Sequence, residues 1–579
     1  MGGQWLLTKV RAGPNIAAWA ARISVTAATV ALWSLGACSN PSDKTVQPIN
    51  TVAPTNVPTS AQTASAVPQR ATPTTVPAPD GLRRGGTLRF AVAESPPHLD
   101  PHQTVSPALL TWGPGIAYSR VFRFVTGPDV TSPDGELVCD LCSSWRQPDP
   151  TTIHITIRND ARWQLVAPVG RRLVTAYDVV YSLNRLATPG WPSASLMANV
   201  LSVTAPDNET MEVKLKSPDA EALENLADSH ARIVSEIAVA EKGNLLRGPT
   251  VGSGPWVVSS FETGFATYDA NNDYYEEDFP YLDRIETQVM PDPATRLAVV
   301  QTKIFDMNQA PFRDIKEAFG TTPGLTYLRT PEHGAGVFTM VNARRPWLDD
   351  PEVRKSLLLA WDPWAIVSDT WDGEATVGLG LPVSHHSWLL SDLELGAAFA
   401  MPEIARSTLT AATSDPKAPR SVVITAGEYG DLYIATAEAL AAQLSAVGVP
   451  ATVTRVSTRD YADRVWASGD YDVLVGPQPP FASLSAYLMS TIHSKGAANP
   501  AGARSDTLDA LIEAQRTELS YDSRRENVLE IQRQMLVNAD RFAVAGRVSH
   551  WVYWPYVHGL SPNMFRGESH WLTQIWLDK

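Results

Sequence analysis

The sequence predicts a mixed α/β protein with more than one β-sheet. Stretches with the two-residue hydrophobic alternation of strands recur along the chain, and stretches with the 3.6-residue period of helices lie between them. No fixed-period repeat is present, which argues against a solenoid or a propeller. The 579 residues, 44% of them hydrophobic, are also enough for several domains with their own cores.

Composition excludes several classes of protein. A disordered chain would be poorer in hydrophobic residues. The formal charge of −14 and the lack of a Lys/Arg cluster argue against nucleic acid as a partner. Three cysteines are too few for a disulfide framework, so the core must provide the stability.

The N-terminal residues predict export. Lys9, Arg11 and Arg22 precede or flank an apolar stretch at 23–35, which is shorter than the ~20 residues that span a bilayer. We therefore expect residues 1–37 to be a signal peptide. The sequence Leu-Gly-Ala-Cys that ends at Cys38 resembles the lipobox of bacterial lipoproteins, which implies that Cys38 is lipidated. The alternative is an ordinary signal with a chance cysteine.

Residues 38–85 predict an extended spacer. From 39 to about 80 this segment is built mainly of Pro, Thr, Ser, Ala, Val, Asn and Gln and has no aromatic residue, so it cannot bury enough apolar surface to fold. The predicted layout is a soluble body, lipid-anchored to the outer face of the bacterial cytoplasmic membrane.

The soluble body opens with a strand behind Gly85 and Gly86. Further strands are expected at 153–157, 211–215, 284–290, 337–341, 421–425 and 451–456. Helices are expected at 176–186, 294–303, 350–361, 432–447, 505–514 and 523–539. Two starts have a clear physical signature: Thr175 can cap a helix with Asp178 in its first turn, and Asp292 precedes a proline at the first helical position.

Several phrases carry a family resemblance from about residue 85 to the C-terminus. They are Gly-Gly-Thr-Leu at 85–88, Pro-Pro-His-Leu-Asp-Pro at 96–101, the helix at 175–185, Val-Gly-Ser-Gly-Pro-Trp at 251–256, Pro-Asp-Pro-Ala-Thr-Arg at 291–296, Asp-Pro-Glu-Val-Arg at 350–354 and Gly-Asp-Tyr-Asp at 469–472. In this order they resemble the family 5 solute-binding proteins of ABC importers, the peptide/nickel type also called cluster C.

The resemblance implies a two-lobed periplasmic-binding-protein-like α/β fold of type II with a hinge between the lobes. Lobe I would comprise 86–330 and 548–579, with an extra subdomain at about 122–248, and lobe II would comprise 331–547. A ligand held between such lobes contacts both and so favours the closed form.

The candidate ligand-binding residues are aromatic or polar groups on loops, which suit a bulky organic solute. In lobe I they are Ser95, His98, Gln103 and Tyr118, and in lobe II they are Trp388, Glu428, Tyr429, Tyr433, Gln478 and Phe481. For each aromatic residue, simple packing is the alternative.

One departure from the family bears on the solute. Peptide-binding relatives carry an acid after the strand that matches 471–475, where it pairs with the free amino group of the peptide. Residues 476–484 contain no acid. Since a buried ammonium without a counter-charge is costly, the sequence disfavours a free-amine oligopeptide unless Asp472, Glu428 or Asp431 turns in.

Cys139 and Cys142 predict a local structural disulfide, with free thiols as the alternative. No metal site and no cofactor are expected: Pro101 breaks the helix that would align His98 with His102, and the phosphate-loop, nucleophile-elbow and zinc-protease motifs are absent.

The expected function is therefore that of a substrate-binding lipoprotein, a monomer rather than an enzyme, whose partners are an extracellular solute and the permease subunits of an ABC importer. The competing classes are an extracytoplasmic hydrolase of oligosaccharides or peptides, and a sensor.

Overall fold

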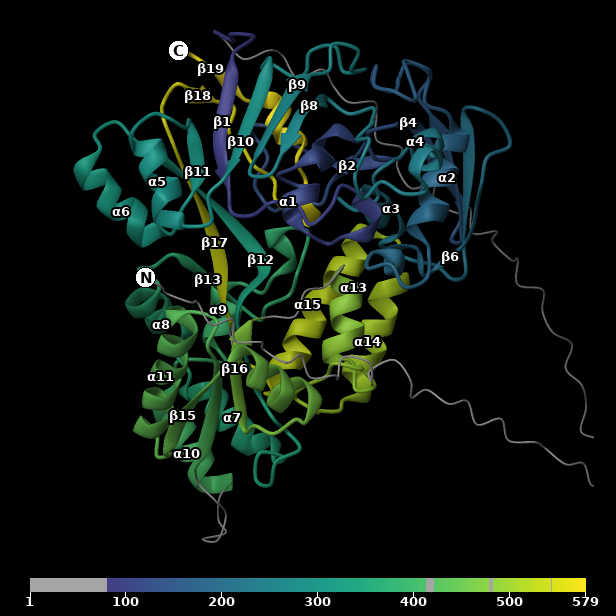
Figure 1. Ribbon diagram of the computed structural model, residues 1–579. Helices are drawn as coiled ribbons and strands as arrows, with labels where there is room; N and C mark the ends of the chain where they lie inside the picture. Colours follow the sequence, from purple (N-terminus) through teal and green to yellow (C-terminus); the bar gives the residue numbers. More distant parts are fainter. Residues whose placement is uncertain (1–80, 413–420, 478–482, 543) are drawn as a thin grey trace, which may run out of the picture. The chain divides into compact units, whose positions relative to one another are not determined.

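The computed structural model describes residues 81–579 apart from 413–420, 478–482 and 543 (Figure 1). The predicted signal peptide, Cys38 and the spacer up to residue 80 lie outside the described residues, as do Gln478 and Phe481. Within the described part, no helix combines the length and the apolar character needed to cross a bilayer.

The first sheet contains the strand that opens the body. Its order is β1 (Thr87–Val92), β10 (Arg284–Val289), β9 (Phe265–Ala270) and β8 (Trp256–Glu262). β1 pairs in parallel with β10, a strand almost 200 residues further along the chain, and the other pairings are antiparallel. The short helix α1 (Pro107–Leu110) follows β1.

A second sheet is inserted between these strands in sequence. It has the order β4 (Cys142–Asp149), β5 (Thr152–Ile157), β7 (Thr210–Leu215) and β6 (Val200–Thr204) and is antiparallel throughout. Its neighbours in sequence are β2 (Phe122–Phe124), β3 (Leu137–Cys139), α2 (Ala176–Leu186), α3 (Ala222–Ala227) and α4 (Glu236–Lys242). These elements lie between residues 122 and 242.

The third sheet joins segments from the middle and the end of the chain. Its order is β11 (Met307–Gln309), β17 (Val544–Tyr553), β12 (Thr326–Val341), β16 (Val473–Pro477), β14 (Val422–Gly427) and β15 (Ala451–Val456), and β13 (Ala375–Gly378) pairs with β17. The long strands β12 and β17 are antiparallel and run side by side (Figure 1). We call β12 and β17 the crossing strands.

Helices account for the remaining regular structure around these sheets. They are α5 (Pro293–Gln301), α6 (Phe312–Thr321), α7 (Pro351–Ala360), α8 (Pro363–Thr370), α9 (Asp392–Gly396), α10 (Pro402–Ala412), α11 (Asp431–Ala446), α12 (Thr458–Tyr461), α13 (Leu484–Tyr487), α14 (Asp506–Thr517) and α15 (Tyr521–Asn538). The C-terminal strands β18 (Val557–His558) and β19 (Trp576–Leu577) pair with each other.

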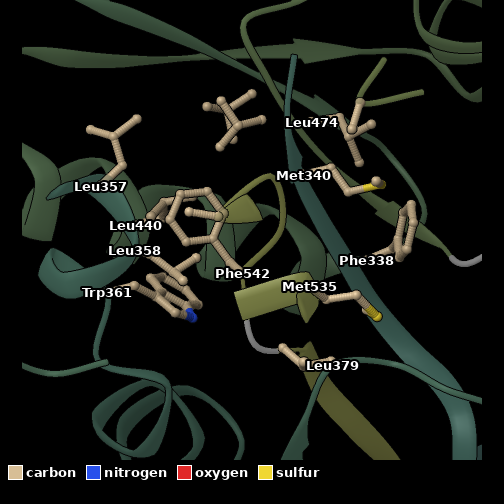
Figure 2. Packing of buried hydrophobic residues seen from close by; sticks show 14 of the residues in the cluster. Phe338, Met340, Leu357, Leu358, Trp361, Leu379, Leu440, Leu474, Met535 and Phe542 are labelled. Carbon is tan, nitrogen blue, oxygen red and sulfur yellow. The ribbon is translucent and has the colours of Figure 1, made fainter. Parts of the chain in front are cut away.

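The largest core lies where β12 meets the helices around it (Figure 2). Phe338 and Met340 point from one face of β12, as the two-residue strand period requires. They belong to the same buried cluster as Leu357 and Trp361 of the α7 region, and the Trp361 ring meets Phe542 edge-on at 5.8 Å. Residues of β14 and β16 belong to the same core, which therefore holds these two strands in place.

Thr175 is the N-cap residue of α2, as the sequence predicts, and Asp178 in the first turn completes a capping box and also forms an ion pair. Its carboxylate accepts from the backbone N–H of Thr175 at 2.9 Å and binds both terminal nitrogens of Arg172 at 2.6 and 2.7 Å. We expect Asp178→Ala to lower the free energy of unfolding by about 1–3 kcal/mol, because it removes a cap and a bidentate pair together. Urea unfolding followed by circular dichroism measures this. Glu403→Ala, an exposed first-turn acid of α10 paired with Arg406, is the matched control and should cost under about 0.5 kcal/mol; equal losses would contradict the prediction.

Candidate functional site

A cavity of about 210 Å³ opens at the carboxyl end of β1. Its walls are aromatic: the Trp112 ring lies 6.3 Å from the Phe90 ring and 5.6 Å from the Trp551 ring. The lining residues come from β1 and α1 and the residues that follow each of them, from β11 and β17, and from α5. They are Phe90, Ala91, Val92, Ala93, Glu94, Pro107, Ala108, Trp112, Arg296, Asn308, Gln309 and Trp551. An apolar cavity with a few polar groups is the usual form of a small-molecule site.

Two polar groups of this cavity wall lack partners. The indole Nε1 of Trp551 and the amide Nδ2 of Asn308 are buried without an acceptor in the described part of the chain. Since an unpaired buried donor costs about 1–3 kcal/mol, both groups mark the cavity as a place where a ligand oxygen would be stabilised. Arg296 also lines the cavity, and its Nη1 donates to the backbone oxygens of Met290 and Pro291 at 2.8 and 2.7 Å.

A smaller hollow adjoins the first and shares Val92, Glu94, Ala108 and Trp112 with it. Ser95 and Pro96 lie on its wall, opposite the β8–β9 hairpin with its partly exposed Phe261 and Phe265. The predicted Ser95 therefore lies beside the cavity.

A cluster of tyrosines forms the second part of the candidate site, at the ends of β14 and β16. The Tyr429 ring meets Tyr433 at 5.9 Å and Tyr461 edge-on at 5.6 Å. Gly427 and Gly476 make this packing possible, because a Cβ at either position would collide with the ring of Tyr429 or Tyr461. Burial raises the pKa of all three phenols, so they remain neutral hydrogen-bonding groups at physiological pH.

Strand β17 links the cavity and the tyrosine cluster. Trp551 lines the cavity, and Arg547, four residues earlier on the same face of β17, is close enough to Tyr433 for its charge to oppose the pKa rise that burial causes. Four residues of extended chain span about 13 Å. The two halves of the candidate site are thus separated by roughly the length of a bulky organic solute.

Glu332 holds the Arg547 side chain at the crossing strands. Arg547 Nε donates to Glu332 Oε2 at 3.0 Å, and the hydroxyl of Ser549 also contacts the Glu332 carboxylate. On the same strand, His550 lies 2.8 Å from Glu374, which also accepts from Arg329. The crossing strands are therefore braced by ion pairs near the site.

The remaining predicted residues of lobe I lie in a braced loop or in the core. His98 Nε2 is 3.1 Å from the backbone oxygen of Gln103, whose side chain donates to Asp100 at 3.0 Å. Asp100 in turn pairs with Arg185, so this loop is tied to α2. Tyr118 is buried in the core. The structure brings neither His98, Gln103 nor Tyr118 into the cavity lining.

In lobe II, Trp388 lies in the core, where its Nε1 donates to the Tyr521 hydroxyl at 2.8 Å. The backbone N–H of Glu428 donates to Val456 at 2.9 Å and the side chain is exposed. Of the described predictions, Ser95, Glu428, Tyr429 and Tyr433 thus adjoin the two halves of the candidate site. The residues that sequence reasoning missed are Phe90, Trp112, Asn308 and Trp551, three of which lie on strands rather than loops.

Cys139 and Cys142 form the disulfide that the sequence predicts, between the end of β3 and the start of β4, with their Cα atoms 4.9 Å apart. In the described ranges, no three His, Cys, Asp or Glu side chains gather in a way that could hold a metal ion.

Comparison with known proteins gives a family match over more than half of the chain. Residues 136–499 match the model of the bacterial extracellular solute-binding proteins, family 5. The probable D,D-dipeptide-binding periplasmic protein DdpA of Escherichia coli is 24% identical over 403 residues, 68% of this chain and 74% of that protein. The oligopeptide-binding protein AppA of Bacillus subtilis is 28% identical over 226 residues, 37% of this chain and 40% of that protein.

Solved structures show the same two-lobed α/β fold. The ABC transporter substrate-binding protein CtaP of Listeria monocytogenes superposes with a TM-score of 0.72 at 18% identity, over 86% of this chain and all of that one. The unliganded open form of the murein tripeptide-binding protein MppA gives a TM-score of 0.73 at 17% identity, over 86% and 99% of the two chains. The predicted fold class is confirmed.

Proposed function

The chain belongs to the bacterial extracellular solute-binding proteins of family 5, and from this premise we propose that it captures an extracellular solute between two lobes and delivers it to the permease subunits of an ABC importer. The lobes would be 86–330 with 548–579, and 331–547. The chain would act as a monomer, anchored through a lipid on Cys38, and would release the solute chemically unchanged.

The observation that carries this proposal is the arrangement along β17. One face of this strand presents Trp551 to the cavity and Arg547 toward the tyrosine cluster. A solute that contacts both would bridge segments of the two proposed lobes, and these contacts would favour the closed form.

The solute is proposed to be a bulky organic molecule without a free α-amine. The tyrosine cluster offers neutral phenols, the neighbouring Glu428 side chain is exposed to solvent, and residues 476–484 contain no acid. Relatives whose names specify dipeptides or oligopeptides indicate solutes of comparable size.

Native mass spectrometry of protein purified from its own host tests the proposal, together with small-angle scattering before and after removal of the bound molecule. We expect a co-purified organic molecule, a smaller radius of gyration in its presence, and no product when the protein is incubated with it. A rigid body with no bound molecule, or an altered molecule, would contradict the proposal.

Tyr429 is expected to contribute directly to affinity. Its side chain is 38% exposed and is held in place by Tyr433 and Tyr461, so it offers a pre-positioned aromatic face. We expect Tyr429→Ala to weaken binding of the recovered solute about tenfold, equivalent to ~1.4 kcal/mol. Isothermal titration calorimetry measures the change. Tyr177→Ala, an exposed tyrosine of α2, is the control and should leave the affinity unchanged; unchanged affinity in both variants would remove Tyr429 from the site.

A further inference from the structure

The cavity at the end of β1 contains hydrogen-bond donors that the protein itself does not use. Trp551 and Asn308 are 2% and 5% exposed, so water does not readily satisfy their free N–H groups. The indole nitrogen can only donate. The Asn308 amide is oriented by its Oδ1, which accepts from the backbone N–H of Gln309 at 2.9 Å and leaves the Nδ2 end unpaired. An oxygen acceptor on a ligand could pair with both N–H groups.

The charge at the cavity favours an anionic acceptor. Arg296 lines the cavity, and the two contacts of its Nη1 are to neutral backbone oxygens. Across the described ranges, no carboxylate lies within ion-pair distance of Arg296. The nearby Glu94 is exposed, so solvent screens its charge. The exposed Asp292 carboxylate is hydrogen-bonded to Thr295, and the charge of Arg296 further lowers its pKa. Two unpaired N–H donors and a guanidinium that forms no ion pair in the described ranges thus line one cavity, an environment suited to a carboxylate.

The walls define what the carboxylate is attached to. Phe90, Trp112 and Trp551 present aromatic surfaces around a space of about 210 Å³. Such walls favour a flat apolar group through burial and ring contacts. Asn308 and Arg296 then lie on the polar part of the lining.

We propose that this cavity is a carboxylate subsite of the solute-binding site, in which Trp551 Nε1, Asn308 Nδ2 and Arg296 recognise a carboxylate borne on a flat apolar group. The inference rests on the proposed function, because it names the part of the solute that lobe I would hold. It also extends the conclusion about the tyrosine cluster: the solute would carry an acid at one end and lack a free amine at the other.

Indole-3-acetate and indole-3-acetamide are matched probes, since they share the ring and differ in charge. In the full-length protein labelled with ¹⁵N-tryptophan, the indole signal of Trp551 is identified as the one that Trp551→Phe removes. We expect indole-3-acetate to shift this signal and to bind at least tenfold more tightly than the acetamide. Trp551→Phe, which keeps an aromatic wall but removes the N–H donor, should weaken binding of indole-3-acetate about tenfold or more. Asn308→Asp should abolish binding, because it replaces a donor with a negative charge that repels the carboxylate.

Equal affinity for the two probes, or unchanged binding of indole-3-acetate by Trp551→Phe, would overturn the proposed subsite. Trp571→Phe is the folding control, because Trp571 packs against Trp551 at 5.4 Å but its Nε1 already donates to the Glu568 backbone oxygen. If the protein releases a host solute and closes upon it while neither probe shifts the Trp551 signal, the subsite is wrong and the proposed function stands. If indole-3-acetate binds as expected while no host solute and no closure of the lobes are found, the proposed function fails and the subsite stands.

Discussion

Replacing Arg524 with methionine is expected to lower the free energy of unfolding by about 3–5 kcal/mol, because it leaves the buried Glu221 carboxylate without its ion-pair partner, whereas Glu224 keeps a contact with Arg566 at 3.4 Å. Arg524 of α15 donates to Glu221 at 2.7 Å and to Glu224 at 3.4 Å, and its side chain is 6% exposed. Glu221 also accepts from the backbone N–H of Ser485 at 3.0 Å. These contacts join segments that the proposed architecture assigns to opposite lobes, so the variant should also favour separation of the lobes.

Urea unfolding and small-angle scattering check both effects. Arg525→Met is the matched control, because the Arg525 side chain is one-third exposed and pairs with the exposed Glu526. This variant should lower the free energy of unfolding by less than about 1 kcal/mol. Adding Glu221→Gln to Arg524→Met should recover part of the loss, because the buried charge that lost its ion-pair partner is removed. If Arg524→Met is no more destabilising than Arg525→Met, the network does not stabilise the fold.

Glu568→Gln is expected to lower the free energy of unfolding by a similar amount, about 3–5 kcal/mol. Arg120 Nη2 donates to both oxygens of the Glu568 carboxylate, at 2.8 and 2.7 Å. The Arg120 and Glu568 side chains are 2% and 0% exposed. The same carboxylate accepts from the backbone N–H groups of Phe124 and His570 at 2.9 and 2.7 Å. The substitution leaves Arg120 buried and uncompensated. Glu286→Gln, which breaks a half-exposed pair with Arg89, is the control and should cost under about 1 kcal/mol at pH 7.

The pH dependence of stability provides a second measurement. Burial opposes ionisation of Glu568, but the charge of Arg120 and the backbone donors outweigh it and lower the pKa to about 2. Because the folded pKa lies below the ordinary value of 4.5, the stabilisation is complete above pH 4.5 and is lost as the pH falls toward 2. The difference in unfolding free energy between wild type and Glu568→Gln should therefore shrink over this interval; a constant difference would contradict the assignment.

The regular elements could be predicted because their signals are local. The helix expected at 176–186 is observed as Ala176–Leu186, and the strand expected at 451–456 as Ala451–Val456. Helix caps and two-residue alternation depend only on neighbours in sequence. The pairing of Arg120 with Glu568 spans 448 residues, and nothing in the local sequence of either residue indicates the other.

The candidate site was predicted only in part for the same reason. Tyr429 and Tyr433 follow a strand end, and this position is visible in the sequence pattern. Tyr118 and Trp388 are also aromatic and were expected to contact the ligand, but both are buried in cores. Aromatic character alone does not distinguish the wall of a binding site from core packing. Asn308 and Trp551 were missed since their free donors become visible only when β11 and β17 lie side by side.

The last segment of the chain completes structures begun hundreds of residues earlier: β17 inserts between β11 and β12, and Glu568 neutralises Arg120. A nascent chain on the ribosome that lacks residues 544–579 would therefore expose unpaired strand edges and a stranded guanidinium. Folding to the final state would have to await synthesis of residues 544–579.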